Sequence, residues 1–578
     1  MASFLVRNGL ILAGLVLVPV FVGEFWAYQL GLYFLYALAA MGVGLIWGQA
    51  GILPLGQGMF VALAAYLAAY GLLGLGPSPL AYLIIPAACL AVALLGFVFA
   101  VTIFRGRLEQ GPSFSLITLA LTLAAFQIAT TWSSVTGGFN GLRNIPGLPG
   151  LDGFLDLYYL IAVVLALAIA TVDYLVRAPI GALWRAVADN ERRLAFFGYD
   201  VAALKAVAFG VACGLAGLAG ALYAPQQNLV TPDIAGFAFS GDLVIFAAAG
   251  GRAAVLGPVV GAIVVGVLSA ELRGRFPWWE IAIALFFIVV VLRLPGGLMT
   301  LFAPLKRLRL ARSPVPRPSQ APDKPRIATP LTVAFEEVCV RMGDVTILDG
   351  LSMQTGDEAV LCVIGPNGAG KTSALNVMTG ALPKRGGRIV IDGVDVLRPQ
   401  PAAVARSGVG RKFQTPSVFQ KLTIDENLAI ALWAGRWRGI DLLLPSLFGW
   451  TTPLLDEMRR RFEFMRSGAK PASDLSHGER QILELSMALI TEPRLLLLDE
   501  PCAGLSHEET AAVIDAIRWA RHYLINLRII IIEHDMELVR RLADRVVVLH
   551  QGRFLADGSV EEVQGNPDVR AVYVGGTR

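Results

Sequence analysis

The stretch of this sequence most able to do chemistry is "GPNGAGKTS", residues 365–373. It follows the apolar run "AVLCVI" and precedes "ALNVMTGAL", so it matches the phosphate-loop pattern between a strand and a helix. Lys371 can neutralise the β- and γ-phosphates, and Thr372 can ligate Mg²⁺. The glycines let backbone N–H groups converge on phosphate oxygens. This predicts an ATP site formed by Gly365, Pro366, Asn367, Gly368, Ala369, Gly370, Lys371, Thr372 and Ser373.

Two carboxylates follow the apolar run "LLLL" in the stretch "LLLLDE", residues 495–500. An unpaired buried carboxylate is costly, so Asp499 needs a cation, and Mg²⁺ beside Thr372 supplies one. Glu500 is then placed to polarise the attacking water. His534 ends the strand-like run "RIIIIEH", where its side chain can reach the γ-phosphate. We therefore expect Asp499 as a metal ligand, with Glu500 and His534 catalytic.

A third motif, "DLSHGERQ" at residues 474–481, opens a helix with Ser476 as N-cap and Gly478 allowing close backbone approach. The phosphate loop, "GRKFQTPSVF", "LSHGE", "LLLLDEP" and "EHD" together resemble, in order and spacing, the ATPase domain of ABC transporters over residues 331–578. The resemblance implies that Gln414 binds Mg²⁺ and assists catalysis. It also implies that Ser476 and Gly478 contact nucleotide held by a second ATPase subunit.

Four positions depart from the pattern of that family. The usual signature is LSGGQ, whereas this chain has His477 and Glu479 in it. The stretch "RMGD" places Met342 where relatives stack an aromatic ring on adenine, and a thioether packs less strongly there. Ser506 stands where many of these ATPases carry Asp. These departures bear on γ-phosphate capture and on selectivity for the base.

The composition of the whole chain indicates a membrane protein. The 578 residues are 55% hydrophobic and 16% charged, against about 25% charged in ordinary soluble proteins. The net charge of +4 is too small to indicate a nucleic-acid partner. The cysteines form no CxxC pair, so neither a zinc site nor a disulfide framework is indicated. All histidines lie in the second half, which leaves the first half without an imidazole for metal binding or proton relay.

The first 303 residues contain a series of apolar runs near the roughly 20 residues that a membrane-spanning helix needs. The runs are 9–23, 29–47, 51–73, 80–104, 114–131, 157–176, 204–226, 257–270 and 277–296. Arg and Lys concentrate on the cytoplasmic side, which puts Arg7 and Arg105 inside and residues 132–156 outside. Residues 240–250 are apolar but too short to span, which favours a broken or re-entrant half-helix lining a cavity.

The first half resembles the permeases of the branched-chain amino acid and urea uptake family. The matching stretches are "LPLGQGMFVALAAYLAAY", "TGGFNGL", "APIGALWRAVADNERRLAFFGYD" and "GLAGLAGALYAPQ". For "GLAGLAG", close packing between helices is more probable than a role in solute binding. The resemblance makes residues 178–200 the coupling helix that docks near the Gln414 loop. It also makes Gln57, Thr136, Asn140 and Gln226 the polar candidates for solute contact.

Together these patterns predict an N-terminal polytopic α-helical membrane domain fused to a C-terminal α/β P-loop ABC ATPase domain. The expected boundaries are 1–303 for the permease, 304–330 for a proline-rich basic linker and 331–578 for the ATPase. The family resemblance implies an ATP-driven importer subunit in a bacterial inner membrane, with the ATPase cytoplasmic. Its expected partners are a second permease/ATPase, as a homodimer or homologous half-transporter, and a periplasmic solute-binding protein.

The solute and the direction of transport stay open at this point. The motifs slightly favour urea or a short amide over a branched-chain amino acid. The alternatives are an ion-coupled carrier or channel with a regulatory ATPase domain, and an ABC exporter. Almost no acidic residues lie centrally in the apolar spans, which disfavours proton coupling.

Overall fold

The computed structural model describes residues 2–106, 111–151, 153–301, 318–324 and 329–574. Its contacts divide the chain into two compact units. The first comprises Met1–Ala188 and Val201–Val315, and the second comprises Asp189–Asp200 and Pro316–Arg578. Most of the expected linker, residues 304–317 and 325–328, lies outside the described residues. The second unit thus includes a short piece of chain from the middle of the expected permease.

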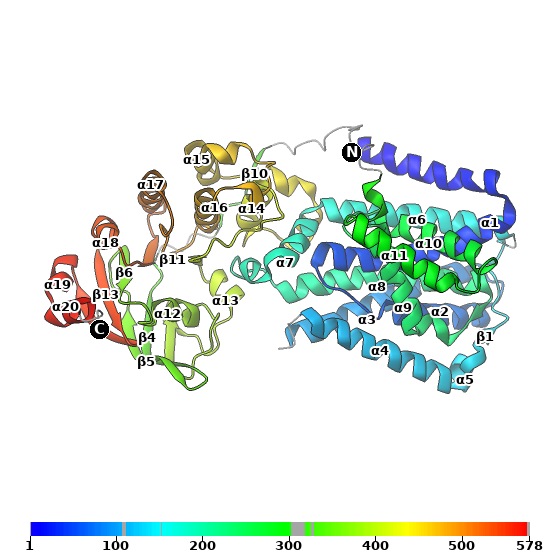
Figure 1. The fold of residues 1–578 in the computed structure, drawn as a ribbon, viewed down its shortest axis with the longest axis horizontal. Helices are drawn as coiled ribbons and strands as arrows, with labels where there is room; N and C mark the ends of the chain where they lie inside the picture. Colours follow the sequence, from blue (N-terminus) through cyan, green and yellow to red (C-terminus); the bar gives the residue numbers. More distant parts are fainter. Residues whose placement is uncertain (1, 107–110, 152, 302–317, 325–328, 575–578) are drawn as a thin grey trace. The chain divides into compact units, whose positions relative to one another are not determined.

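The first unit is built almost entirely of helices (Figure 1). α8 packs against α3, α2 and α1, and α1 also packs against α6. The helices are α1 (Ala2–Ala50), α2 (Gln57–Leu75), α3 (Ile84–Arg105), α4 (Gly111–Thr131), α5 (Ser133–Thr136), α6 (Phe154–Arg177), α7 (Pro179–Ala195), α8 (Val201–Gln227), α9 (Phe237–Gly250), α10 (Gly257–Arg273) and α11 (Trp279–Arg293). The short strands β1 (Leu142–Arg143) and β2 (Leu229–Val230) pair antiparallel in its loops.

Within the described residues, six helices are long and apolar enough to cross a membrane, fewer than the apolar runs suggested. The runs 9–23 and 29–47 lie on the two helical segments of α1, which meet at a kink at Gly23, where φ is 77° and ψ is 169°. The runs 257–270 and 277–296 fall on α10 and α11, which have 17 and 15 residues. The expected short apolar helix near 240–250 is confirmed as the 14-residue α9.

The glycines of "GLAGLAG" lie where α8 meets its neighbours. A Cβ on Gly217 would stand 2.9 Å from Cys89 Cα of α3, and one on Gly214 would stand 3.4 Å from Ala93 Cβ. A Cβ on Gly220 would overlap the carbonyl of Val61 in α2. The packing interpretation of this motif is therefore confirmed.

Among the described residues, the second unit contains a six-stranded and a four-stranded sheet, besides a short two-stranded pair. A six-stranded sheet has the order β14-β13-β6-β12-β11-β9 and is parallel except for β14 at its edge. A four-stranded antiparallel sheet has the order β5-β4-β7-β8. The strands are β4 (Val333–Met342), β5 (Val345–Gln354), β6 (Val360–Ile364), β7 (Gly386–Ile391), β8 (Val394–Asp395), β9 (Val409–Lys412), β11 (Leu495–Asp499), β12 (Arg528–Ile532), β13 (Arg545–His550) and β14 (Arg553–Gly558). Because parallel strands end at one edge, the ends of β6, β11 and β12 come together.

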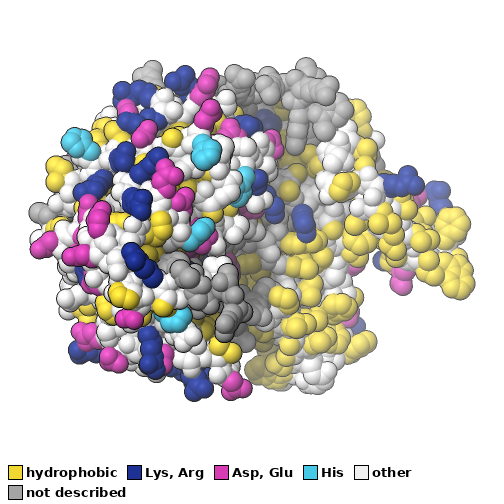
Figure 2. Space-filling view, turned by 60° about the vertical axis from the view of Figure 1, so that its left-hand side comes forward, with side chains coloured by type: hydrophobic (Ala, Val, Ile, Leu, Met, Phe, Trp, Pro, Cys, Tyr) yellow, Lys and Arg dark blue, Asp and Glu magenta, His cyan; other side chains and the backbone are white. Residues whose placement is uncertain are grey.

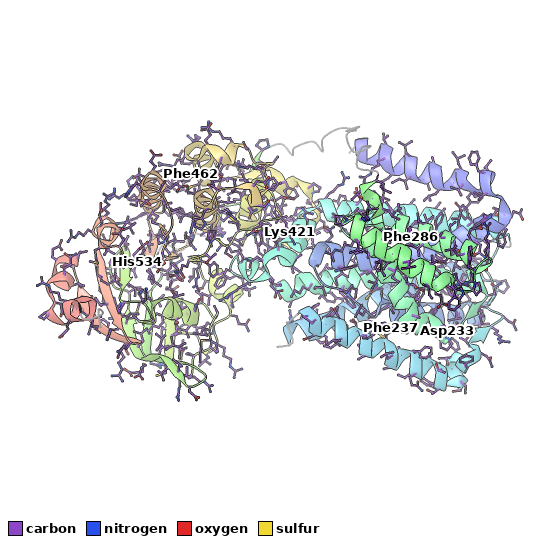
Figure 3. The ribbon with its side chains drawn as sticks, viewed as in Figure 1. Asp233, Phe237, Phe286, Lys421, Phe462 and His534 are labelled. Carbon is purple, nitrogen blue, oxygen red and sulfur yellow. The ribbon has the colours of Figure 1, made fainter. Side chains whose placement is uncertain are left out.

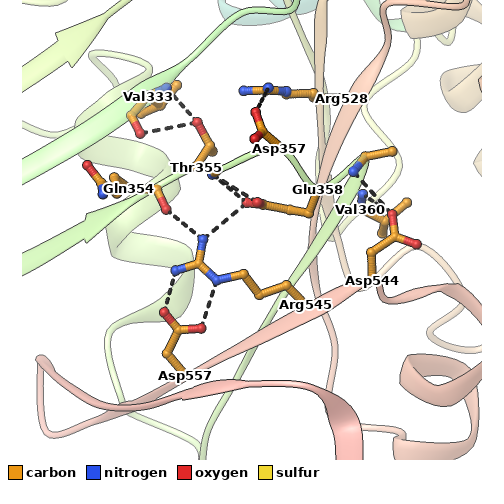
Figure 4. Close-up of polar contacts among 12 residues, drawn as sticks. Val333, Gln354, Thr355, Asp357, Glu358, Val360, Arg528, Asp544, Arg545 and Asp557 are labelled. Atoms are coloured by element: carbon orange, nitrogen blue, oxygen red, sulfur yellow. Dashed lines mark hydrogen bonds and ion pairs between the residues drawn. The ribbon is translucent and has the colours of Figure 1, made fainter.

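Helices surround this sheet and extend beyond it. They are α12 (Lys371–Met378), α13 (Pro401–Arg406), α14 (Ile424–Trp433), α15 (Pro453–Arg461), α16 (His477–Ile490), α17 (His507–Tyr523), α18 (Met536–Leu542), α19 (Val560–Gly565) and α20 (Pro567–Val574). Before this unit's main body, β3 (Ser319–Gln320) pairs with β10 (Trp450–Thr451). Arg545 of β13 links the six-stranded sheet to the four-stranded sheet. It pairs with Asp557 of β14 and donates to Gln354 O of β5 at 3.1 Å (Figure 4).

The two units differ in the chemistry of their surfaces. Figure 2 shows charged and other polar side chains spread over the second unit, whereas hydrophobic side chains gather on the first. Large apolar side chains such as Phe21, Leu90 and Leu292 are 82%, 69% and 76% exposed. Apolar exposure on this scale is unusual for a protein surrounded by water and suits lipid contact.

Candidate functional site

The phosphate loop joins β6 to α12 at the carboxyl edge of the six-stranded sheet. Gly365, Gly368 and Gly370 have φ of 151°, 82° and 93°, a region that glycine adopts without strain. Lys371 Nζ donates to the carbonyls of Gly365 and Pro366 at 2.7 and 3.0 Å, so its ammonium group lies over the loop. Burial lowers the pKa of Lys371, and the charges of Glu500 and Asp499 oppose that shift. The loop therefore presents a cation and open backbone to an anion.

Asp499 lies beside this loop at the end of β11. Asp499 is 1% exposed, and its Oδ1 accepts a hydrogen bond of 3.3 Å from Thr372 Oγ1. Burial raises the pKa of this carboxyl, while the guanidinium of Arg411, 4.0 Å away, opposes the shift. Mg²⁺ prefers hard oxygen ligands such as carboxylates and hydroxyls. The desolvated carboxylate and adjacent hydroxyl fit that ion, because a divalent cation there would offset the cost of burying Asp499.

Three further predicted residues, Glu500, Gln414 and His534, lie close together next to Asp499. Glu500 adopts a left-handed conformation with φ of 44°, and its N–H donates to Ile532 O at 3.0 Å. Gln414 Nε2 donates to Glu500 Oε2 at 2.8 Å. His534 Nδ1 lies 3.8 Å from Glu500 Oε1, and its side chain is 62% exposed (Figure 3). Strained backbone of this kind is maintained where the surroundings fix it, often at functional sites. Glu500 is thus held between an amide and an imidazole.

Comparison with known proteins identifies this arrangement. Residues 348–503 match the profile of the ABC transporter family. The high-affinity branched-chain amino acid transport ATP-binding protein LivG of Salmonella typhimurium is 34% identical over 250 residues, which are 42% of this chain and 97% of LivG. The chain belongs to the ABC transporter family. BraF of Pseudomonas aeruginosa, a protein of the same description, is 36% identical over 253 residues, 41% of this chain and 94% of BraF. The crystal structure of a nucleotide-free ATP-binding cassette is similar with 25% identity and a TM-score of 0.36, covering 42% of this chain and 98% of its own.

This ABC transporter chain also carries a permease. Residues 26–293 match the profile of the permease component of the branched-chain amino acid transport system. LivG and BraF align with less than half of the chain. The chain is therefore a fused permease and ATPase, and a multi-pass membrane protein whose ATPase binds and hydrolyses ATP.

Residues 189–200 of the transporter belong to the ATPase-containing unit. The end of α7 departs from helical geometry at Asn190, whose φ and ψ are −155° and 84°. Asn190 Nδ2 then donates to Ser417 Oγ at 3.0 Å, in the loop that follows Gln414. The ring of Phe196 packs edge-on against Phe413, with centroids 4.9 Å apart. This part of the predicted coupling segment thus lies against the Gln414 loop, as expected.

A buried ion pair anchors this segment. Arg193 Nη1 lies 3.3 Å from Glu484 Oε1, and the two side chains are 1% and 0% exposed. The same Nη1 donates to Arg411 O at 2.7 Å, and Phe413 N donates to Glu484 Oε1 at 3.1 Å. The guanidinium of Arg411 reaches in turn toward Asp499. A continuous polar path therefore connects Arg193 with the carboxylate nearest the phosphate loop.

The signature motif lies away from the loop, beside α17. Ser476 caps α16, accepting from Glu479 N at 3.1 Å, while the Glu479 carboxylate accepts from Ser476 N at 2.8 Å. The predicted N-cap is thus confirmed. A Cβ on Gly478 would collide with the Glu509 carboxylate, so this glycine permits a close approach. Within one chain, Ser476 and Gly478 therefore neighbour α17, while the loop residues gather around Asp499.

The predicted solute-contact residues are dispersed in the permease unit. Gln57 and Gln226 are 1% and 4% exposed, and their amide nitrogens donate to Ala212 O and Tyr28 O, respectively. Thr136 uses its hydroxyl within its own turn, donating to Ala129 O at 2.5 Å. Asn140 is exposed. These contacts give no common cluster of the four side chains.

Sequence reasoning missed Glu484, Arg193 and Arg411. Glu484 lies between Leu483 and Leu485 in the buried part of α16. An acid in the buried part of a helix requires a buried partner, and this signal was available from the sequence. Its partner was not, because Arg193 lies 291 positions away in the chain.

Proposed function

We propose that this chain is one half of an ATP-driven importer of small zwitterionic or polar solutes, with branched-chain amino acids as the first candidates. The single observation that carries the ATP-driven part is the cluster of Lys371, Thr372, Asp499, Glu500 and Gln414 at one sheet edge. The names of LivG and BraF support the solute class. Urea or a short amide is the competing solute, favoured slightly by the motifs.

In this proposal the groups at the site bind the nucleotide and the metal ion and activate the attacking water. The loop 365–373 and Lys371 hold the phosphates, and Thr372 and Asp499, with Gln414 at the edge, hold Mg²⁺. The ion supplies charge neutralisation to the phosphates. Glu500 accepts a proton from the attacking water, oriented by Gln414, and His534 contacts the γ-phosphate. Ser476 and Gly478 complete the site of the partner ATPase.

The proposal extends to the assembly and the domain boundaries. The permease occupies 1–303, the linker 304–330 and the ATPase 331–578. A homologous half-transporter or a second copy supplies the other nucleotide site. A periplasmic solute-binding protein delivers the solute from outside a bacterial inner membrane, which sets the direction as import.

The decisive experiment uses the full chain with its partner subunits in sealed vesicles. Uptake of labelled leucine and urea is measured with and without ATP. Glu500→Gln should lower ATP hydrolysis and uptake by at least about 100-fold, since it removes the proposed general base. Glu561→Gln, an exposed acid in the first turn of α19, is the control and should match wild type.

Each failure points to a different alternative. Uptake that survives Glu500→Gln or the removal of ATP would favour a channel or ion-coupled carrier. ATP-dependent loss of preloaded solute would favour an exporter.

A further inference from the structure

The chain between α1 and α2 turns back into the first unit. α1 ends at Ala50, residues 51–56 are not helical, and Gln57 opens α2. Gln57 Nε2 donates to Ala212 O and lies 3.2 Å from the position of a Cβ on Gly42. Gly42 precedes the end of α1 by about two turns, roughly 12 Å of helix. Non-helical backbone therefore lies beside the body of a membrane-spanning helix, which is tolerated where it is buried in protein or lines a cavity.

The start of the half-helix α9 meets the start of α2. Gly58 N, in the first turn of α2, donates to Ser240 Oγ of α9 at 3.0 Å. A Cβ on Gly58 would stand 2.8 Å from Ile234 O, in the turn before α9 where Figure 3 labels Asp233 and Phe237. Glycine occupies both N-caps, so neither N-cap residue offers a side chain of its own to the first-turn amides. Two helix N-termini, each with partial positive charge, thus converge.

Two buried polar atoms near this point have no hydrogen-bond partner among the described residues. They are Gln57 Oε1 and Thr122 Oγ1, in residues that are 1% and 0% exposed. Thr122 Oγ1 lies 2.7 Å from the position of a Cβ on Gly56, so it stands over the N-cap of α2. Buried polar atoms are nearly always paired, so these two atoms are available to hydrogen-bond a bound molecule.

We propose that the first turns of α2 and α9, with Gln57 and Thr122, form the solute site, and that it takes the carboxylate and ammonium groups of an α-amino acid. The inference rests on the proposed function and selects between its two solute classes. The convergent helix starts bind the carboxylate, as helix N-termini bind anions. Gln57 Oε1 accepts from the ammonium, and the Thr122 hydroxyl donates to the carboxylate. Urea has no carboxylate, so no anion would balance the partial positive charge of the two helix starts.

The test compares uptake by variants of the full chain, assembled with its partner subunits in vesicles and supplied with ATP. Thr122→Val keeps the side-chain shape and removes only the hydroxyl, and Gln57→Leu removes the amide. Each should lower uptake of labelled leucine by at least about tenfold, the loss of a hydrogen bond to a charged group. Thr122→Ser should stay within about twofold of wild type. Thr131→Val is the matched control on α4, because the Thr131 hydroxyl is exposed and donates to Gln127 O at 2.8 Å.

The outcomes separate this inference from the proposed function. If Thr122→Val and Gln57→Leu take up leucine as Thr131→Val does, the site is wrong and ATP-driven import stands. If wild type accumulates urea and not leucine, the carboxylate assignment is overturned. If wild type moves neither solute with ATP, both proposals fail. Should Gln57→Leu not assemble, Thr122→Val against Thr122→Ser decides alone.

Discussion

Replacing Arg193 by methionine is expected to loosen residues 189–200 from the ATPase unit. Arg193 and Glu484 are fully buried and 3.3 Å apart, so the variant leaves a desolvated carboxylate without its cation. Removing one partner of a buried ion pair costs roughly 3–5 kcal/mol. Since about 1.4 kcal/mol corresponds to a tenfold change, opening of this segment should become roughly 10²- to 4 × 10³-fold more frequent.

Hydrogen–deuterium exchange of the full chain in detergent measures this opening directly. Peptides covering 189–200 should exchange faster in Arg193→Met, and peptides covering β11 should not. Adding Glu484→Gln should restore much of the protection, because the amide is neutral and still accepts from Phe413 N. Arg192→Met is the control, since that neighbour is exposed. Exchange at the wild-type rate in Arg193→Met would refute the idea that this pair holds the segment.

Three further predictions concern the ATPase unit. Glu479→Gln keeps the capping box, because Gln also serves at that position. It removes the negative charge of a carboxylate that accepts from Ser476 N. ATP-driven association of two ATPases, measured by light scattering, should therefore need less ATP. Met342→Phe, at a side chain 58% exposed, should tighten binding of a fluorescent ATP analogue by about 2- to 10-fold, as expected for one aromatic stacking pair, and leave binding of inorganic triphosphate unchanged. Burial lowers the pKa of Lys324 from its ordinary 10.5 to about 7, so the folded state disfavours the protonated amine. Attachment of residues 318–324 should therefore weaken as the pH falls from about 10 to 7. Hydrogen–deuterium exchange corrected for intrinsic rates measures this, and Lys324→Met should remove the pH dependence.

The nucleotide site could be predicted from the sequence because each of its parts is local. The loop 365–373 and the strand end at Asp499 carry their conformation in a few consecutive residues, through glycine, apolar strand and carboxylate. Parallel pairing of β6, β12 and β11 then brings these ends to one edge. The two-unit organisation also followed from composition, since apolar runs and a charged α/β pattern separate cleanly.

The helix ends and contacts of the permease were harder to predict from the sequence, for a physical reason. Its helices are apolar on every side, so composition locates them but does not set their ends. Gly23 interrupts α1 without a break in hydropathy. α10 has 17 residues and extends past the run 257–270, whereas α11 has 15 residues and is shorter than the run 277–296. The contact of Thr122 with the start of α2 depends on packing between distant segments, and no local pattern marks it.

Inclusion of residues 189–200 in the ATPase unit matters for anyone who dissects this protein. A recombinant fragment that begins at residue 331 leaves "DNERRLAFFGYD" behind, and the Glu484 carboxylate and the Phe413 ring then face solvent. Such a fragment is expected to aggregate, because an aromatic ring that was packed against Phe196 then lies on its surface. A synthetic dodecapeptide of that sequence, added to the fragment, should cover the exposed surface and keep the fragment soluble. Its binding would also measure how strongly residues 189–200 hold to the ATPase.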